Sequence, residues 1–388
     1  MKHIFYLTVL IVCVFAANGQ TSKYSVEVNI SSRVDTTYNS DKKEIYHLFK
    51  SYLEARPDSF YNNPYWTQNE KDPKDSSVIS EFYVGFYSLN LKPAVLFANW
   101  KPFILTIEPI STNKYLLRVA LISDTLSADK VLTILNINAV RENNKWLLEN
   151  TFNDIVSSWK SQQFKHIKYV YPPTYNFNTN LAEKSVFFCD SIAKLLNIKK
   201  LDSFNYYISD HPDKMGLLFG YEFYNQNYTT GMTRLYKKQI FSAKGNEYYP
   251  HEFMHMLLIN SFKDTMDYML QEGLCCFLGE NNTQTYEDRL IYLANDYLND
   301  MPTYTFKNLL TNSANYNGYN TAYPTGSLIV EIIYRKKGFN GIMQLLNSKA
   351  NSEETIYKTV KEITGLNKKQ FELEFRQLLK QHVKWPEK

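Results

Sequence analysis

The sequence predicts an α+β protein with two parts: a small N-terminal domain, in which a helix packs on an antiparallel sheet, and a mostly α-helical C-terminal domain. Three observations lead to this prediction. One amphipathic helical segment precedes four β-rich runs, two adjacent prolines then interrupt the pattern at residues 172–173, and helical periodicity dominates after residue 250. The 388 residues are enough for two domains of about 150 residues each. We expect the boundary close to residue 165.

Composition excludes two classes of protein. The formal net charge of +4, from 43 Lys+Arg and 39 Asp+Glu, is too small and too evenly spread to indicate nucleic-acid binding. A content of 44% hydrophobic residues can supply ordinary cores, so the chain is not disordered. The sequence also contains 31 Tyr and 24 Phe, which we interpret as composition and core rather than as aromatic-lined binding grooves.

Residues 1–19 have the pattern of a cleaved secretory signal peptide. Lys2 and His3 precede an apolar run over residues 4–17, and small residues follow before Gln20. The run is shorter than the ~20 residues that a membrane-spanning helix needs, and no later stretch is sufficiently apolar. We therefore expect a secreted or periplasmic protein without stable membrane insertion.

The cysteines predict a protein without a disulfide framework. Cys13 lies in the predicted signal peptide. Lipoprotein anchoring through Cys13 is disfavoured, because Val12 is bulkier than the small residue that usually precedes the cleavage site of a lipoprotein signal peptide. Cys189, Cys275 and Cys276 remain, and three cysteines cannot form a framework. We interpret the neighbouring Cys275 and Cys276 as small core residues rather than as a redox pair.

The N-terminal domain, residues 20–164, is predicted as one helix on an antiparallel meander. The helix covers residues 41–55, and its apolar stripe consists of Ile45, Leu48, Phe49, Tyr52 and Leu53. Four β-rich runs joined by turn residues follow at 103–110, 115–122, 131–140 and 146–152. The order of these elements resembles the cone-shaped nuclear-transport-factor-two-like fold. No group of charged residues in this domain is typical of a catalytic site.

The C-terminal domain, residues 165–388, is predicted to begin with mixed elements and to continue as helices. The expected elements before Pro250 are a helix at 181–196, a strand at 204–209 and a strand-like run at 232–243. A polar, glycine-containing stretch covers residues 219–231. The last expected helix covers residues 368–383.

His251, Glu252 and His255 form an H-E-x-x-H pattern at the start of a predicted helix. Pro250 suits the first turn of that helix. His251 and His255 stand one turn apart on the same face, so both imidazoles can bind one ion. Glu252 then lies beside the ion, where its carboxylate can act as a general base. Chance produces this pattern in about one of a hundred chains of this length.

Glu272 supplies a third metal ligand on a second predicted helix. Sixteen residues separate it from His255, and the polar residues 260–267 can turn the chain so that this helix returns antiparallel. Two neutral imidazoles and one carboxylate leave a fourth position open, as a catalytic zinc site requires. We therefore predict one Zn²⁺ ion bound by His251, His255 and Glu272. The sequence assigns no role to Glu280.

These residues resemble the motif of the gluzincin metallopeptidases, in which H-E-x-x-H is followed after a spacer by Glu on a second helix. The continuation Glu272-Gly273-Leu274 is similar to the peptidase MA-type branch, which includes aminopeptidase N-like and thermolysin-like enzymes. The resemblance is specific in residues 250–280 and diffuse elsewhere in residues 165–385. It implies a zincin-like domain in which an edge strand, here within residues 232–243, lies beside the active-site helix and pairs with extended substrate. The Gly-x-Met-Glu-Asn exopeptidase signature of the aminopeptidase N-like enzymes is absent.

The resemblance also implies a tyrosine that stabilises the oxyanion of the tetrahedral intermediate. Tyr323 is the first candidate and Tyr319 the second, because the segment 319–328 leads into an apolar helix.

The activity that the resemblance implies is that of a secreted zinc metallopeptidase that hydrolyses peptide or protein substrates with Glu252 as the general base. The alternative is a catalytically weak or inactive zincin that serves as a zinc-stabilised module for binding a protein or glycan. The sequence leaves open the oligomeric state, the cleavage specificity, the choice between endopeptidase and exopeptidase, and the role of the N-terminal domain.

Overall fold

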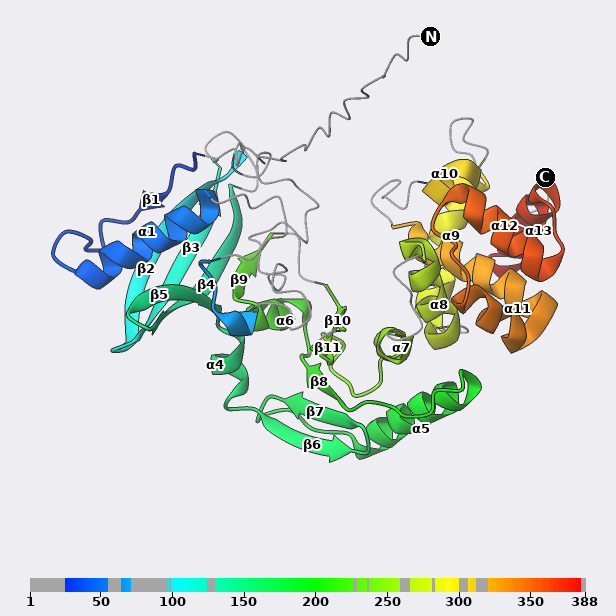
Figure 1. Cartoon of the computed structure of the whole chain (residues 1–388), viewed down its shortest axis with the longest axis horizontal. Helices are drawn as coiled ribbons and strands as arrows, with labels where there is room; N and C mark the ends of the chain where they lie inside the picture. The colour runs from blue at the N-terminus through cyan, green and yellow to red at the C-terminus, as the bar shows by residue number, and fades with distance from the viewer. Residues whose placement is uncertain are drawn as a thin grey trace, which may run out of the picture.

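The computed structural model describes residues 25–54, 64–70, 97, 99–123, 130–225, 229–235, 237–258, 266–280, 283–299, 306–311 and 320–384. These residues form a mixed helix-and-sheet fold that contains two sheets (Figure 1). The predicted signal peptide and Tyr319 lie outside the described residues. None of the helices in the described ranges has both the length and the apolar content that a bilayer crossing requires.

The first sheet is the predicted antiparallel meander. Each of its four long strands pairs antiparallel with the next, and β1 (Asn29–Ile30) adds in parallel to the first of them. The long strands are β2 (Lys101–Ser111), β3 (Lys114–Ile122), β4 (Val131–Glu142) and β5 (Lys145–Asn150). Helix α1 (Ser40–Glu54) buries all five residues of the predicted apolar stripe in the same core as this sheet. The predicted helix and the four predicted strands are therefore confirmed.

The second sheet has the strand order β10-β11-β8-β7-β6. Its strands are β6 (Lys160–Phe164), β7 (Ile167–Tyr171), β8 (Phe204–Ile208), β10 (Gly231–Arg234) and β11 (Gln239–Ser242). The central strands β7, β8 and β11 are parallel, and the outer strands β6 and β10 pair antiparallel with their neighbours. The predicted strand-like run at 232–243 is thus two strands, of which β10 is the edge strand.

The segment between β8 and β10 returns to the first sheet. After helix α6 (Pro212–Leu218), strand β9 (Tyr221–Tyr224) pairs antiparallel with β4. The Thr133 hydroxyl donates a hydrogen bond of 2.7 Å to the Phe223 carbonyl, and Arg118 forms an ion pair with Glu222. From the sequence alone this stretch is only polar and glycine-containing, because its pairing partner lies about 90 residues earlier. The two sheets also share one apolar core, so a division into independently folding domains stays a prediction.

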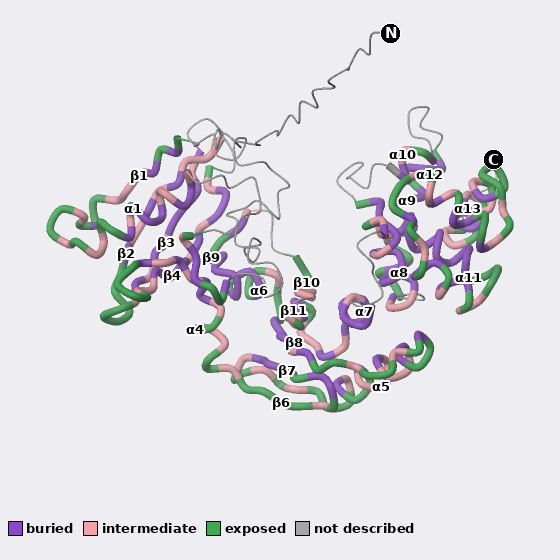
Figure 2. Tube along the Cα trace, viewed as in Figure 1, coloured by how far each residue is buried: buried purple, intermediate pink, exposed green. Residues whose placement is uncertain are grey.

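Helices cover the second sheet and form the C-terminal part of the molecule. The remaining helices of the described residues are η1 (Gln68–Glu70), α4 (Phe152–Val156), α5 (Thr179–Leu195), α7 (Pro250–Leu258), α8 (Tyr268–Glu280), α9 (Gln284–Tyr297), α10 (Phe306–Thr311), α11 (Ala322–Leu346), α12 (Glu353–Thr364) and α13 (Lys368–His382). Helix α7 lies between the second sheet and the helical cluster (Figure 1). Both α7 and α8 are buried along most of their length (Figure 2).

Helix α8 contacts both of its neighbouring helices at glycines. A Cβ atom on Gly273 would lie 2.2 Å from the carbonyl carbon of Gly326 in α11, and one on Gly326 would lie 1.9 Å from the carbonyl oxygen of Met269. A Cβ atom on Gly279 would lie 2.9 Å from the backbone nitrogen of His251 in α7. No other residue type fits at these crossings without moving a helix. Glycine therefore determines how closely α8 approaches α7 and α11.

Replacing Gly273 with Ala should lower the free energy of unfolding by about 3 kcal/mol or more, because the added methyl group overlaps the Gly326 backbone. Urea denaturation measures this loss. Leu373→Ala on α13 is the matched control, since the Leu373 side chain is 56% exposed, and it should change stability by less than about 0.5 kcal/mol. Equal stability of Gly273→Ala and the unmodified protein would contradict the close backbone contact between α8 and α11 at Gly273 and Gly326.

Candidate metal centre

Helix α7 directs both histidines of the motif to one point. The helix begins at Pro250, as predicted, and its buried apolar residues pack against the second sheet and the helical cluster. Because His251 and His255 are four residues apart, their side chains lie on the same face. Their Nε2 atoms are 3.2 Å apart.

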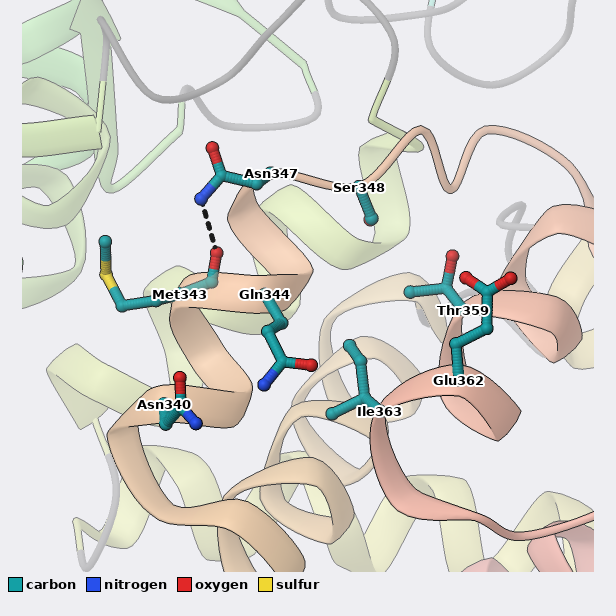
Figure 3. A pocket seen from close by; sticks show the side chains of 8 residues that line it. All are labelled: Asn340, Met343, Gln344, Asn347, Ser348, Thr359, Glu362 and Ile363. Atoms are coloured by element: carbon teal, nitrogen blue, oxygen red, sulfur yellow. Dashed lines mark hydrogen bonds between the residues drawn. The ribbon is translucent and has the colours of Figure 1, made fainter.

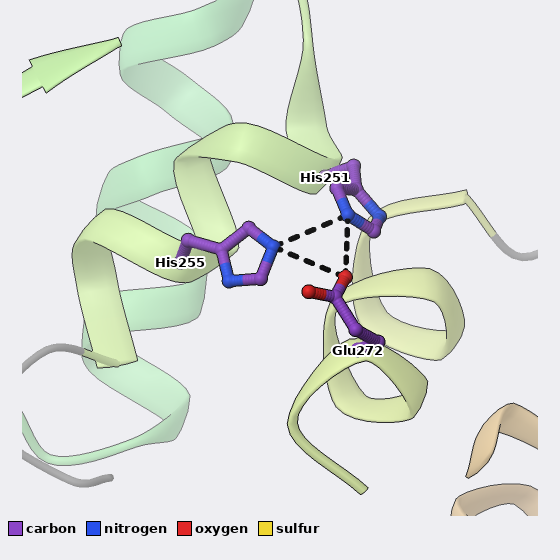
Figure 4. Close-up of side chains that lie close together, drawn as sticks. All are labelled: His251, His255 and Glu272. Carbon is purple, nitrogen blue, oxygen red and sulfur yellow. Dashed lines mark hydrogen bonds and ion pairs between the residues drawn. The ribbon is translucent and has the colours of Figure 1, made fainter. Parts of the chain in front are cut away.

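Glu272 completes the group from α8 (Figure 4). Its Oε2 atom lies 3.2 Å from His251 Nε2 and 3.3 Å from His255 Nε2. The three atoms form a nearly equilateral triangle. Atoms that each bind a tetrahedral zinc ion at about 2.0–2.1 Å are about 3.3–3.4 Å from one another. The three predicted ligands thus come together at the spacing that one such ion requires.

The Glu272 carboxylate has an oxygen that the protein does not satisfy. The residue is 7% exposed, and Oε2 accepts no hydrogen bond of acceptable geometry although both imidazoles lie within ion-pair distance. Burial raises the pKa of Glu272, but positive charge on His255 and His251 holds that pKa well below its usual range. A buried carboxylate of this kind is stabilised by a cation. The residues therefore fit a metal ion.

Glu252 follows His251 on α7 and is held by the edge strand β10. Its Oε2 atom accepts a hydrogen bond of 2.6 Å from the Thr233 hydroxyl on β10. A Cβ atom on Gly231, at the start of β10, would lie 2.5 Å from Glu252 Oε1, so a larger residue there would displace the Glu252 carboxylate. Strand β10 thus lies beside α7, as the sequence led us to expect, and orients the carboxylate of Glu252.

Tyr323 lies next to the metal ligands at the beginning of α11. Its ring centre is 5.8 Å from that of His251, with an angle of 26° between the ring planes. Its hydroxyl lies 3.2 Å from that of Tyr268, and the Arg289 guanidinium lies 4.6 Å from the ring centre. Burial, the Glu272 carboxylate and Tyr268 together raise the pKa of Tyr323. Its hydroxyl therefore keeps its proton and can donate a hydrogen bond.

Two cysteines lie behind the histidines, in a position that no pattern in the sequence indicates. Cys275 Sγ is 3.4 Å from His255 Nδ1, and Cys276 Sγ is 3.7 Å from His251 Nδ1. Both are fully buried free cysteines, which agrees with their interpretation as core residues. Their contacts with the nitrogens that face away from the metal position give them a second role, in orienting the imidazoles.

Glu280 also lies behind His251. Its Oε1 atom is 3.7 Å from His251 Nδ1, and its Oε2 atom is 3.3 Å from Arg289 Nε. Glu280 follows Glu272 by eight residues, slightly more than two helical turns, so both carboxylates lie on one face of α8. The spacing of eight residues between Glu272 and Glu280 is the feature of the sequence that indicates a position for Glu280 near the metal ligands. At 3.7 Å this contact is an ion-pair distance and not a hydrogen bond, so Glu280 can act on His251 through its negative charge, which increases the basicity of the ring.

No protein-family model matches this chain, and a comparison with curated proteins finds no match either. The resemblance to the gluzincins is carried by His251, Glu252, His255 and Glu272.

Replacing Glu280 with Gln should weaken zinc binding about 10–100-fold, because the charge behind His251 is removed while the shape of the side chain is kept. Competition with a chromophoric chelator measures the affinity for zinc. Glu287→Gln, at an exposed position on α9, is the matched control and should leave the affinity unchanged. If both variants bind zinc equally well, Glu280 does not support His251.

Proposed function

We propose that this protein is a secreted zinc metallopeptidase that hydrolyses peptide bonds. His251, His255 and Glu272 would hold one zinc ion, with Glu252 as the general base. The observation that carries the proposal is the convergence of two imidazole Nε2 atoms and one carboxylate oxygen at mutual distances of 3.2–3.3 Å. Glu252 follows His251 on the same helix, and Thr233 of β10 holds its carboxylate. The signal-peptide pattern of residues 1–19 supports the secreted or periplasmic location.

A zincin-like arrangement of residues 165–388 is part of the proposal. It is supported by an edge strand, β10, that runs antiparallel to β11 and lies against the helix with both histidines. The position of β10 at the end of the strand order also supports an extended peptide as substrate, because such a peptide can add to a sheet edge through main-chain hydrogen bonds. We further propose a cone-shaped arrangement of the nuclear-transport-factor-two-like type for residues 20–164, to which β9 adds a strand from the C-terminal part of the chain.

Zinc at this centre would supply a Lewis acid that polarises the substrate carbonyl and lowers the pKa of the attacking water. Glu252 takes the proton from that water at Oε1, the oxygen that Thr233 does not engage, and returns it to the leaving amine. The hydrogen bond from Thr233 keeps the carboxylate oriented throughout. Tyr323 donates a hydrogen bond from its neutral hydroxyl to the oxygen on which negative charge develops.

Replacing Glu252 with Gln should lower kcat by about 10²–10⁴-fold and leave one zinc ion bound per chain, because the base is lost while the three ligands remain. Digestion of a broad peptide library, together with metal analysis, measures both quantities. Glu183→Gln, exposed on α5, is the matched control and should cleave normally.

Unchanged turnover in Glu252→Gln would refute the assignment of the base. Stoichiometric zinc without any chelator-sensitive cleavage by the unmodified protein would instead favour the non-catalytic binding module. The positions of cleavage in the same digest distinguish an endopeptidase from an exopeptidase.

Replacing Tyr323 with Phe should lower kcat about 10²–10³-fold with little change in KM, since the lost hydrogen bond forms mainly in the transition state. Steady-state kinetics on a peptide found in the digest measure both constants. Tyr268→Phe provides the comparison, because it removes only the hydroxyl that neighbours that of Tyr323, and its effect should be smaller. An equal loss in both variants would contradict a direct role for Tyr323.

A further inference from the structure

Two tyrosine rings lie next to the imidazole of His251, and each ring carries a cation. The ring centre of Tyr249 is 6.3 Å from that of His251, and the ring centre of Tyr323 is 5.8 Å from it. Lys244 Nζ lies 3.7 Å from the centre of the Tyr249 ring. The Arg289 guanidinium lies 4.6 Å from the centre of the Tyr323 ring. Cations at such distances are attracted to the ring face, so two positive charges are held one aromatic ring away from His251.

The Tyr249 ring connects Lys244 with the general base. A Cβ atom on Gly231 would lie 2.8 Å from the Tyr249 hydroxyl oxygen and 2.5 Å from Glu252 Oε1, so these two oxygens are neighbours at the start of β10. Strand β11 ends at Ser242, which pairs with Gly231, so Lys244 lies just beyond the same end of β10. An extended peptide that adds to β10 would therefore pass Lys244 close to the base.

The ammonium group of Lys244 is available to a ligand. The side chain is exposed, and no carboxylate in the described part of the chain lies within ion-pair distance of Nζ. Partial burial of the ammonium group lowers the pKa of Lys244. Glu280 and Glu252 raise this pKa and Arg289 lowers it, so these charges act on one another. Because Glu280 Oε2 lies 3.3 Å from Arg289 Nε, Lys244 is the cation of this group that lacks an ion pair.

A positive charge in this position favours a carboxylate as its partner. An ammonium group donates hydrogen bonds and accepts none, and a hydrogen bond between two charged groups is stronger than one between neutral groups. A peptide carries carboxylates on its Asp and Glu side chains and at its C-terminal end. Both sources present the same chemical group, so either can pair with Lys244.

The two cavities away from the metal centre offer a carboxylate no such cation. Of the described residues, one charged side chain, Glu362, lines the pocket of about 440 Å³ between α11 and α12 (Figure 3). The cavity of about 550 Å³ at the ends of β7, β8 and β11 is lined by one lysine, Lys214, which is paired with Asp210 at 2.7 Å. An exposed ammonium group without an ion pair thus distinguishes the surroundings of the metal centre from both cavities.

We propose that this protein prefers peptides with a carboxylate close to the scissile bond, and that this carboxylate pairs with Lys244 Nζ while Arg289 adds positive charge to the same region. The preference rests on the proposed function, because it requires a peptide bound along β10. Lys244 is then a residue that determines specificity, and Glu252 remains free to act as the base.

Four pools of N-acetylated peptides test this preference on the mature, zinc-loaded chain. Three pools end in an amide and combine neutral residues with Glu, Gln or Lys, and the fourth combines neutral residues with Gln and ends in a free carboxylate. The rate and the positions of cleavage are measured for each pool. We expect the Glu pool or the free-carboxylate pool to be cleaved about tenfold or more faster than the amidated Gln pool. The faster pool identifies the carboxylate as that of a side chain or of the chain end.

Replacing Lys244 with Gln should reduce this ratio of rates to about threefold or less, because the positive charge is lost. Lys244→Glu should instead favour the Lys pool, since the charge is reversed. Lys369→Gln, exposed on α13, is the matched control and should keep the ratio of the unmodified chain. Equal cleavage of all pools, a preference of the unmodified chain for the Lys pool, or an unchanged ratio in Lys244→Gln would overturn the proposal.

Retention of the same pools on immobilised, zinc-loaded Glu252→Gln separates this proposal from the peptidase assignment. That variant keeps all three metal ligands and should enrich the preferred pool about tenfold over the amidated Gln pool. If no pool is cleaved by the unmodified chain but the enrichment is found, the peptidase assignment fails and the recognition of a carboxylate stands. Cleavage at equal rates without enrichment has the opposite meaning, and the absence of both refutes both.

Discussion

The metal centre depends on how closely helix α8 approaches the helices on either side of it. Gly279 lets α8 contact the first turn of α7, and Gly273 lets it contact α11. Helix α8 carries Glu272 and Glu280, so its position decides that one carboxylate oxygen lies within 3.3 Å of both imidazoles and that a second carboxylate lies behind His251. A side chain at either glycine would move these groups apart. The chemistry of the site therefore rests on backbone contacts at residues that carry no functional group.

Those parts of the fold and site that depend on local spacing could be predicted from the sequence. Helix α1 could be predicted to within one residue at each end, because its apolar stripe repeats with the helical period. His251 and His255 were recognised because a helix places residues four apart on one face. Strand β9 was missed, since nothing in its own four residues indicates a partner in β4. The roles of Glu280 and Cys276 also required the structure, because both depend on which side chain each one faces.

Two buried carboxylates of α8 lie on different sides of His251. Glu272 Oε2 faces the Nε2 atoms of His251 and His255 at 3.2 and 3.3 Å. Glu280 instead faces His251 Nδ1 at 3.7 Å and Arg289 Nε at 3.3 Å. Neighbouring side chains, rather than the carboxylate itself, thus distinguish the carboxylate that can complete a metal site from the one that supports it.

The pairing of β9 with β4 makes the first sheet dependent on residues that are synthesised late. Positions 133–135 of β4 pair with residues 221–224, so a nascent chain that ends before β9 presents that stretch of sheet edge to solvent. Contacts between such distant segments slow folding, because a long loop must close before they form. During synthesis, the N-terminal half would therefore remain exposed to edge-to-edge association until more than half of the chain has emerged. A fragment that ends near residue 164 lacks β9, so this stretch of its sheet edge would stay exposed to edge-to-edge association.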